Sequence, residues 1–380
     1  MITDVLHYLL LKKAKIKNIL NILKREGFIY TSQDIENILK GNQKGVRYGN
    51  VVLERNENGV VCKRFLKIVI DGTLRTFKLF RRQVEITNAL DKDEEFKFPT
   101  IKALKYSFNA SVPYAIFETR ENGDNFGFMH DSPLFYENFL ESDMEKLVNV
   151  IYSFHNAGLS VNKNIWKYTQ NISSDITKYK KDAKKLLKTI ITHKSKDSEI
   201  IEKQVIEILE IYLGHKNLEK IIFDIFEKNW KYVASSKIKN NSYLVHADMQ
   251  IDNIYRHENG DFELLDFEWV GRSDNPVIAI MYDYGNLRAR AWSSPSFQIM
   301  LDKKMLEVGK KYYKDIDVIN SGLTLGKLRS SLMMCRFHLD FTNTVKKDKR
   351  TEEDYKNMYP KTLSDFNEVV KLSPSIYKNL

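Results

Sequence analysis

The stretch from residue 244 to residue 268, LVHADMQIDNIYRHENGDFELLDFE, restricts the fold of this chain more than any other part of the sequence. It opens with a short apolar run, which predicts a buried strand, and polar residues follow at once. A second apolar run comes after the turn-forming letters HENGD and ends at Asp266. The pattern predicts a strand, a polar loop and a β-hairpin that brings Asn253 close to Asp266.

The polar residues of this stretch suit phosphoryl transfer. The reaction needs a carboxylate that accepts or orients the proton of an acceptor hydroxyl, and Asp248 is the candidate. It also needs Mg²⁺, which prefers hard oxygen ligands, and the candidates are Asn253 and Asp266. The order His-x-Asp-x4-Asn, followed by Asp-Phe, agrees with the catalytic-loop and metal-binding pattern of kinases. We expect His246 to support this loop rather than to take part in the chemistry.

A family resemblance rests on four stretches of the sequence. LVHADMQIDNIY, LLDFEW and the later Asp283-Tyr284-Gly285 resemble the aminoglycoside phosphotransferase and choline kinase superfamily, and so does the helical stretch LVNVIYSFHNAGL. The resemblance is good over residues 144–300 and weak over residues 40–130. It implies a two-lobed protein-kinase-like fold with ATP- or GTP-dependent transfer to a small hydroxylated or amino-alcohol substrate. It also implies that Asp283 buttresses the catalytic loop.

The first third of the chain has the pattern of a sheet with one helix. Residues 50–55 and 60–65 are β-rich runs, and the letters NENG between them predict a hairpin turn. Residues 75–90 have helical periodicity, and residues 114–118 predict another strand. This part is therefore expected to form an antiparallel sheet with a helix, as in the nucleotide-binding lobe of a kinase.

Two lysines of the hairpin are candidates for binding the α- and β-phosphates of a nucleotide. Lys63 on the second strand is the leading candidate, and Lys67 is the alternative because period-two counting puts it on the same side. Glu85, on the helix that follows, is the candidate ion-pair partner of the lysine.

Other residues are assigned to the nucleotide with alternatives left open. Glycine recurs at every fourth position over 41–49, so the backbone at Gly45 would approach the phosphates, with a plain surface loop as the alternative. Glu118 lies in the segment 116–119 that is expected to meet the nucleobase through backbone groups.

Two further residues have other expected roles. Glu268 would order the metal site or contact the acceptor, with a structural hydrogen bond as the alternative. His155 is expected to be a core histidine.

Departures from the protein-kinase pattern favour a small acceptor. The glycine spacing is G-x3-G-x3-G, and Ala247 follows His246 where protein kinases carry an arginine. The segment after Asp266 reaches the next helical pattern quickly, which leaves little room for a platform that binds a protein substrate.

The rest of the sequence is mainly helical. Helical periodicity is expected over residues 1–27, 143–158, 170–232, 278–291 and 297–380. We therefore predict an α+β fold with two lobes and an extra N-terminal helical segment. The expected division is a helical extension over 1–34, a nucleotide-binding lobe over 35–120 and a catalytic and substrate-binding lobe over 121–380.

Composition limits the partners. The net charge of +10 is spread along 380 residues without a dense Lys/Arg block, so a nucleic-acid partner is not expected. No apolar run approaches the length of a membrane span, and neither a signal peptide nor a membrane partner is expected. The two cysteines lack the spacing of a zinc site or a disulfide framework, which favours a cytoplasmic protein.

The leading hypothesis is thus a small-molecule kinase that uses Mg²⁺ and ATP or GTP. The alternative is a catalytically weak or inactive kinase-like protein that serves as a binding or scaffold protein. Aminoglycosides, choline-like amino alcohols, sugars and homoserine all stay open as acceptors, and the sequence indicates no oligomeric state.

Overall fold

The computed structural model describes residues 2–40, 47–91, 102–109, 111–119, 123–125, 139–160, 166–192, 214–239, 241–291 and 294–339. The chain divides into two compact units. Unit 1 comprises Met1–Asp124, Val161–Thr169 and Glu263–Trp269. Unit 2 comprises Asn125–Ser160, Gln170–Phe262 and Val270–Leu380.

Unit 1 is built on a five-stranded antiparallel sheet in the order β1-β2-β3-β5-β4. The strands are β1 (Phe28–Ile29), β2 (Tyr48–Glu57), β3 (Val60–Val69), β4 (Ala103–Ser107) and β5 (Tyr114–Glu118). The turn between β2 and β3 has Asn58 at φ 54° and Gly59 at φ 88°. Asn and Gly adopt such positive φ angles more readily than other residues, so the letters NENG form the expected hairpin.

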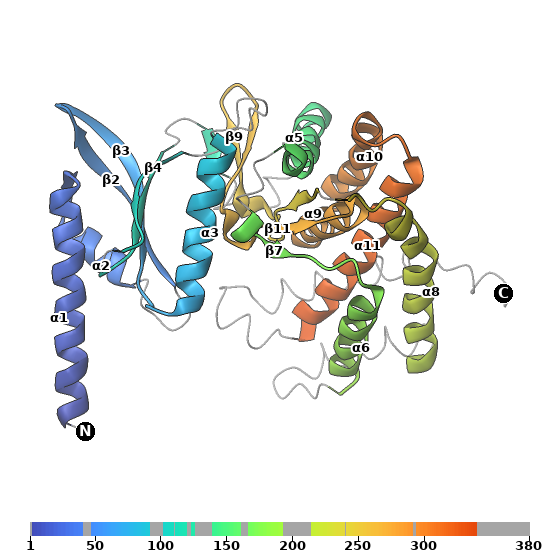
Figure 1. Cartoon of the computed structure of the whole chain (residues 1–380), viewed down its shortest axis with the longest axis horizontal. Helices are drawn as coiled ribbons and strands as arrows, with labels where there is room; N and C mark the ends of the chain where they lie inside the picture. Colours follow the sequence, from blue (N-terminus) through green and yellow to red (C-terminus); the bar gives the residue numbers. More distant parts are fainter. Residues whose placement is uncertain are drawn as a thin grey trace. The chain divides into compact units, whose positions relative to one another are not determined.

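Helices cover both faces of this sheet (Figure 1). Helices α1 (Ile2–Arg25) and α2 (Ser32–Lys40) lie on one face, and α3 (Leu74–Asp91) lies on the other. Alternate residues of each strand point to opposite faces. On β3, Leu66 and Ile68 therefore join the core beneath α1, whereas Val69 packs with Phe80 of α3.

The N-terminal helices share the sheet's own core. Ile19, Ile22 and Leu23 of α1 are almost fully buried in one cluster with residues of β2, β3 and β5. Burying such a side chain stabilises a fold by roughly 1.5–3 kcal/mol. Within unit 1, the C-terminal part of α1 therefore packs against the sheet and belongs to its core.

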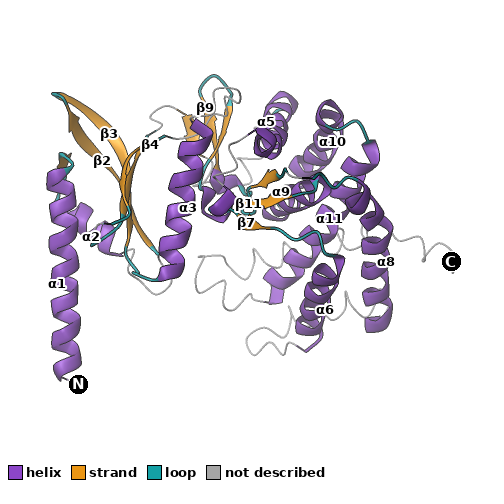
Figure 2. Ribbon diagram, in the orientation of Figure 1, coloured by secondary structure: helices purple, strands orange, loops and turns teal. Residues whose placement is uncertain are grey.

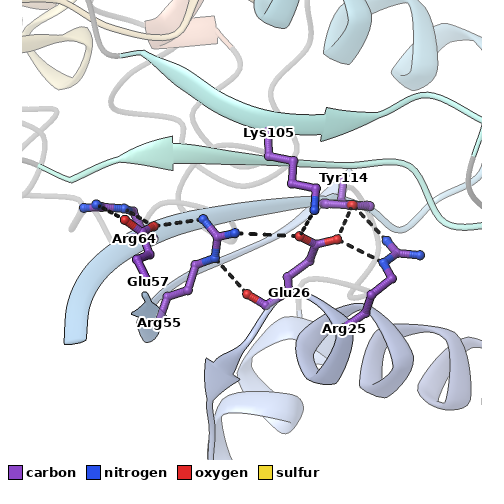
Figure 3. Close-up of polar contacts among 7 residues, drawn as sticks. All are labelled: Arg25, Glu26, Arg55, Glu57, Arg64, Lys105 and Tyr114. Atoms are coloured by element: carbon purple, nitrogen blue, oxygen red, sulfur yellow. Dashed lines mark hydrogen bonds and ion pairs between the residues drawn. The ribbon is translucent and has the colours of Figure 1, made fainter. Parts of the chain in front are cut away.

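A buried carboxylate also ties the end of α1 to the sheet (Figure 3). Glu26 Oε1 accepts hydrogen bonds from the Tyr114 hydroxyl at 2.7 Å and from Arg25 Nε at 3.0 Å. Its Oε2 lies 2.7 Å from Lys105 Nζ of β4. Arg55 Nε on β2 donates to the backbone oxygen of Glu26 at 2.7 Å. The chain then turns at Gly27, which has φ 74° and ends the helix as its position predicts.

Unit 2 is mostly helical, as Figure 2 shows. Its helices are α5 (Glu141–Ser160), α6 (Ile176–Thr192), α8 (Gly214–Ser235), α9 (Pro276–Arg290), α10 (Pro295–Tyr312) and α11 (Ile316–Leu339). A small sheet in the order β7-β11-β8 joins β7 (Gln170–Asn171), β11 (Gly271–Ser273) and β8 (Tyr243–Val245). Helix α9 begins with an Asn275 cap, whose side chain accepts from the N–H of Val277.

The remaining strands are short. They are β6 (Gly123–Asn125), β9 (Ile254–His257) and β10 (Phe262–Leu264). The turn that follows β9 is closed by a 2.8 Å bond from the N–H of Gly260 to the oxygen of His257. This is the turn that HENGD predicts.

The structure confirms the predicted α+β class, with an antiparallel sheet and helix in the first part of the chain and a mainly helical second part. Within the described ranges, no helix is long and apolar enough to cross a membrane. The division of the sequence into 1–34, 35–120 and 121–380 stays a prediction.

Candidate active site

Lys67 lies near the end of β3 and is buried in unit 1, with 4% of its surface exposed. Its Nζ donates to Gln83 Oε1 of α3 at 2.6 Å and lies 3.3 Å from Asp266 Oδ1. The same nitrogen stands 4.2 Å from the ring centroid of Tyr48. A buried ammonium group is costly unless such partners surround it, so this lysine is held in one place.

Lys63 has a different environment. It lies closer to the hairpin turn, its side chain is exposed, and its backbone oxygen accepts from the Thr119 hydroxyl at 2.8 Å. Glu85 of α3 is the expected partner of Lys63, but its Oε1 lies 3.6 Å from Nε of Arg81 on the same helix. The structure thus brings Lys67, and not Lys63, together with a residue of α3 and with Asp266.

Of the other two candidates for nucleotide binding, Glu118 and Gly45, the structure describes only Glu118. Glu118 ends β5, faces Arg64 in the register of β3 and β5, and donates its backbone N–H to Lys102 at 3.0 Å. Gly45 lies outside the described residues. Gly49, at the end of the glycine-rich stretch, belongs to β2, and an added Cβ there would approach Ile38 of α2 to 2.6 Å.

The segment Asp266–Trp269 belongs to unit 1 and continues from β10. Asp266 has φ 57°, a left-handed conformation that is uncommon for residues other than glycine. About a third of its side chain (32%) is exposed while one oxygen pairs with Lys67. Arg82 of α3 fixes the segment by donating to the backbone oxygen of Glu268 at 2.9 Å and to that of Tyr168 at 2.6 Å.

Glu268 is buried and hydrogen-bonded. Its Oε2 accepts from the Tyr48 hydroxyl at 2.6 Å. Burial, and secondly the nearby Asp266 carboxylate, raise the pKa of Glu268 above its ordinary value. Burial followed by the charge of Glu268 likewise raises the pKa of Tyr48. The structure shows Glu268 hydrogen-bonded to Tyr48, and its role at the metal or the acceptor stays a prediction.

In unit 2, the loop after β8 is fastened by one buried carboxylate. Asp283 of α9 is fully buried, and its two oxygens accept from the backbone N–H of His246 at 2.9 Å and of Ala247 at 2.8 Å. His155 of α5, also fully buried, places Nε2 2.9 Å from Asp283 Oδ2. One turn further along α9, the amide of Asn286 donates to the oxygen of Ala247 at 2.9 Å.

These bonds hold an unusual backbone. Ala247 has φ 63°, a left-handed conformation that costs an alanine roughly 1 kcal/mol or more. The imidazole of His246 is fully buried beside Phe154, with ring centroids 6.0 Å apart. His246 therefore has the buried position of a supporting residue, and the strained turn presents the next residue, Asp248.

Asp248 and Asn253 are joined directly. The amide of Asn253 donates to the backbone oxygen of Asp248 at 2.8 Å and lies 3.4 Å from its carboxylate. The loop between them is anchored by Met249 and Ile251, which are almost fully buried, and by a short 3-10 turn over Ile251–Asn253. Asp248 itself is partly exposed.

The candidate metal ligands are few, which suits Mg²⁺ more than a metal ion that is enclosed entirely by protein ligands. Within the described ranges, no three His, Cys, Asp or Glu side chains gather as a metal site. Mg²⁺ is usually bound through one or two protein oxygens together with phosphates and waters. Taken one by one, Asp266 of unit 1 has a partly exposed carboxylate, and Asn253 of unit 2 has an amide whose nitrogen is engaged with Asp248. Their role as metal ligands stays a prediction.

Sequence reasoning missed three residues at these places. Gln83 lies on the buried face of α3, three positions after Phe80, and a polar residue at an apolar position was the signal for it. Asn286 follows Asp283 by three residues, which is one helical turn. Tyr48 had no signal in the sequence, because its contacts with Lys67 and Glu268 depend on the tertiary fold.

No protein-family model and no curated protein matches the sequence. Solved structures of similar fold include an aminoglycoside phosphotransferase from Alicyclobacillus acidocaldarius, with 9% identity, a TM-score of 0.47 and coverage of 86% of this chain and 89% of that one. A choline kinase from Streptococcus pneumoniae has 12% identity, a TM-score of 0.43 and coverage of 83% and 89%. An ethanolamine kinase from Plasmodium vivax has 11% identity, a TM-score of 0.45 and coverage of 96% and 95%. These are kinases of the superfamily that the sequence motifs resemble, and the function proposed below rests on the chain's own residues.

Proposed function

We propose that this protein is a phosphotransferase that moves the γ-phosphate of ATP or GTP to a hydroxyl group of a small molecule. The observation that carries the proposal is the meeting of Lys67 with Asp266, 199 positions later in the chain. A buried lysine beside a partly exposed carboxylate provides one cation for phosphate oxygens and one hard ligand for a metal.

Each residue has a separate role in the proposal. Lys67 binds the phosphates, and Gln83 positions its ammonium group. Asp266 and Asn253 would hold Mg²⁺, which when bound offsets negative charge on the phosphates. Asp248 accepts or orients the proton of the acceptor hydroxyl. Asp283 keeps the backbone of the catalytic loop in place.

In the reaction, the acceptor oxygen forms a bond to the γ-phosphorus as the bond from that phosphorus to the bridging oxygen of the nucleotide breaks. The nucleoside diphosphate leaves with the bridging oxygen, and the hydroxyl proton passes toward the Asp248 carboxylate. Positioning supplies much of the acceleration in such transfers, and oriented groups can contribute several kcal/mol. The bonds that fasten residues 246–253 serve that purpose.

A small acceptor suits this chain better than a protein. Between Asp266 and the start of α9 at Pro276, the chain makes a single 3-10 turn and the short strand β11. Ala247 stands where protein kinases carry an arginine that anchors an activation loop. The cytoplasm, which supplies nucleotide and Mg²⁺, is the location that we infer.

The two lysines of β3 allow a matched test of nucleotide binding. We expect the full chain to bind ATP or GTP in the presence of Mg²⁺, measured by titration calorimetry. Lys67→Ala should weaken that binding at least about tenfold, because a charged hydrogen bond to phosphate is lost. Lys63→Ala should change it little. A reversed order would reassign the lysine, and a wild-type chain that binds neither nucleotide would favour the binding-protein alternative.

A further inference from the structure

Tyr48, at the start of β2, contacts several residues of the proposed nucleotide site, and the proposed function gives it no role. It is 8% exposed. Its hydroxyl donates to Glu268 at 2.6 Å, and its ring lies beneath Lys67 Nζ at 4.2 Å from the centroid. The ring also packs against Phe80 of α3, with centroids 6.4 Å apart. One side chain thus connects β2, β3, α3 and the segment that carries Asp266.

The groups that hold Lys67 are mostly neutral. On α3 its partner is the amide of Gln83, and kinases of known pattern use a glutamate on the corresponding helix. Within the described part of the chain, Asp266 is the carboxylate in ion-pair distance of Lys67. In the proposed function Asp266 also serves the metal, so it cannot be the only support of the lysine.

An aromatic face can take the place of a carboxylate in this setting. The negative face of a tyrosine ring attracts an ammonium group, by about 0.5 kcal/mol at exposed sites and about 2 kcal/mol where water is excluded. Lys67 is buried, so the stronger case applies. Unlike a second carboxylate beside Lys67, the ring carries no net charge, so it holds the ammonium group without adding to the negative charge that Asp266 already supplies.

We propose that Tyr48 is a positioning residue for the phosphate-binding lysine, with its ring holding the ammonium group of Lys67 in place of a helix carboxylate. The inference rests on the proposed function, because it assigns a purpose to the charge of Lys67. The ring carries this role, and the hydroxyl separately fastens the segment that holds Glu268.

Two substitutions separate the ring from the hydroxyl. Tyr48→Phe keeps the ring and loses the bond to Glu268, whereas Tyr48→Leu loses both. With ATP and Mg²⁺ as the probe, Tyr48→Leu should raise the dissociation constant about tenfold, which corresponds to loss of a buried cation–π contact. Tyr48→Phe should stay within about threefold of wild type. Tyr106→Leu, at a tyrosine of β4 that is 40% exposed, is the matched control in the same sheet.

Restoring a carboxylate on α3 gives the decisive comparison. In the double variant Tyr48→Leu/Gln83→Glu, the new glutamate lies at the position that already contacts Lys67, so binding should recover most of the tenfold loss. A side chain that only filled space would not be replaced in this way. Circular dichroism and a thermal melt on each variant identify those that have not folded. If Tyr48→Leu is one of them, Tyr48→Met, which also lacks the ring, takes its place in both comparisons.

The outcomes are distinguishable. Suppose that wild type binds ATP with Mg²⁺ but Tyr48→Leu has the same dissociation constant as Tyr48→Phe, or that adding Gln83→Glu to a folded Tyr48→Leu protein does not restore ATP binding. Either result overturns the role of Tyr48 and leaves the proposed function standing. If wild type itself binds no nucleotide, the proposed function fails first.

Discussion

Asp283 Oδ1 accepts a hydrogen bond from the backbone N–H of Ala247 at 2.8 Å, and through this bond α9 holds the conformation of the loop that follows β8. Its second oxygen accepts from His246 at 2.9 Å, so consecutive peptide groups are held by one side chain. Ala247 takes a left-handed φ of 63°, which an isolated chain would avoid. The carboxylate thus stabilises the turn that presents Asp248.

Removing this carboxylate should weaken both the fold and the activity. Asp283→Ala leaves the N–H groups of His246 and Ala247 and the buried His155 without their acceptor, so we expect a loss of about 3 kcal/mol in the free energy of unfolding. Urea denaturation measures it. Glu258→Ala, an exposed acidic residue in the turn after β9, is the control and should change stability little. A loss below about 1 kcal/mol for Asp283→Ala would contradict the role.

The left-handed conformation of Ala247 predicts how substitutions at this position change stability. Glycine adopts φ 63° without steric cost, so Ala247→Gly should be neutral or stabilising by up to about 1 kcal/mol. Valine has a branched Cβ and should destabilise the protein by about 1–3 kcal/mol. In thermal unfolding, the melting temperature of wild type should lie between those of the two variants or equal that of Ala247→Gly. Equal melting temperatures for the Gly and Val variants would show that the turn carries no strain.

The two lysine candidates of β3 show what pattern reasoning alone could not separate. Lys63 and Lys67 lie on the same side of β3 by period-two counting, and the sequence placed Lys63 first. The structure distinguishes them by depth, since Lys63 lies close to the hairpin turn and Lys67 precedes the buried run Ile68–Ile70. The apolar letters after Lys67 were a usable signal. The choice of Gln83 over Glu85 as the contact on α3 needed the pairing of strand and helix.

Other local features were predictable because they depend on neighbouring residues alone. The NENG hairpin, the helix over α3 and the strand over β5 follow from turn residues and periodicity. The helix expected over residues 143–158 continues to Ser160. Gly158 lies within it and is required by close packing, because a Cβ there would lie 2.4 Å from the backbone oxygen of Ser242. Such a contact between distant segments has no local signal.

That contact gives a prediction for Gly158. In an exposed helix, glycine to alanine is stabilising by up to about 1 kcal/mol. Here the new methyl group would meet backbone atoms of Ser242 and Leu244, which cannot rotate away, so Gly158→Ala should destabilise by about 1–3 kcal/mol. Chemical denaturation checks the sign. Ser160→Ala, at the exposed end of the same helix, is the control, and a stabilised Gly158→Ala would contradict the packing of α5 on β8.

The buried carboxylate of Glu26 makes stability depend on pH. Burial raises its pKa, but hydrogen bonds from Lys105, Tyr114 and Arg25 outweigh burial and lower the pKa below its ordinary value (Figure 3). A lowered pKa in the folded state adds stability above the ordinary value and loses it as pH falls through the folded value. Glu26→Gln should therefore cost about 1–3 kcal/mol at pH 7 and progressively less below about pH 4.

Denaturation of wild type and Glu26→Gln at pH 7, 5, 4 and 3 measures this difference. Glu54→Gln, at an exposed carboxylate of β2, is the matched control and should show little difference at any of these values. A Glu26→Gln difference that grows as the pH falls would contradict the direction of the pKa shift. The result also reports on α1, because the carboxylate fastens the end of that helix to the sheet.

The central claim is that Asp248 acts in transfer of a phosphoryl group to a hydroxyl, and one measurement tests it most directly. The full chain is incubated with Mg²⁺, γ-labelled ATP or GTP, and amino alcohols, aminoglycosides, sugars and homoserine as separate acceptors. We predict that wild type labels at least one acceptor and that folded Asp248→Ala, with nucleotide binding retained, labels it at least about a hundredfold more slowly. Equal labelling by the two proteins would contradict the account.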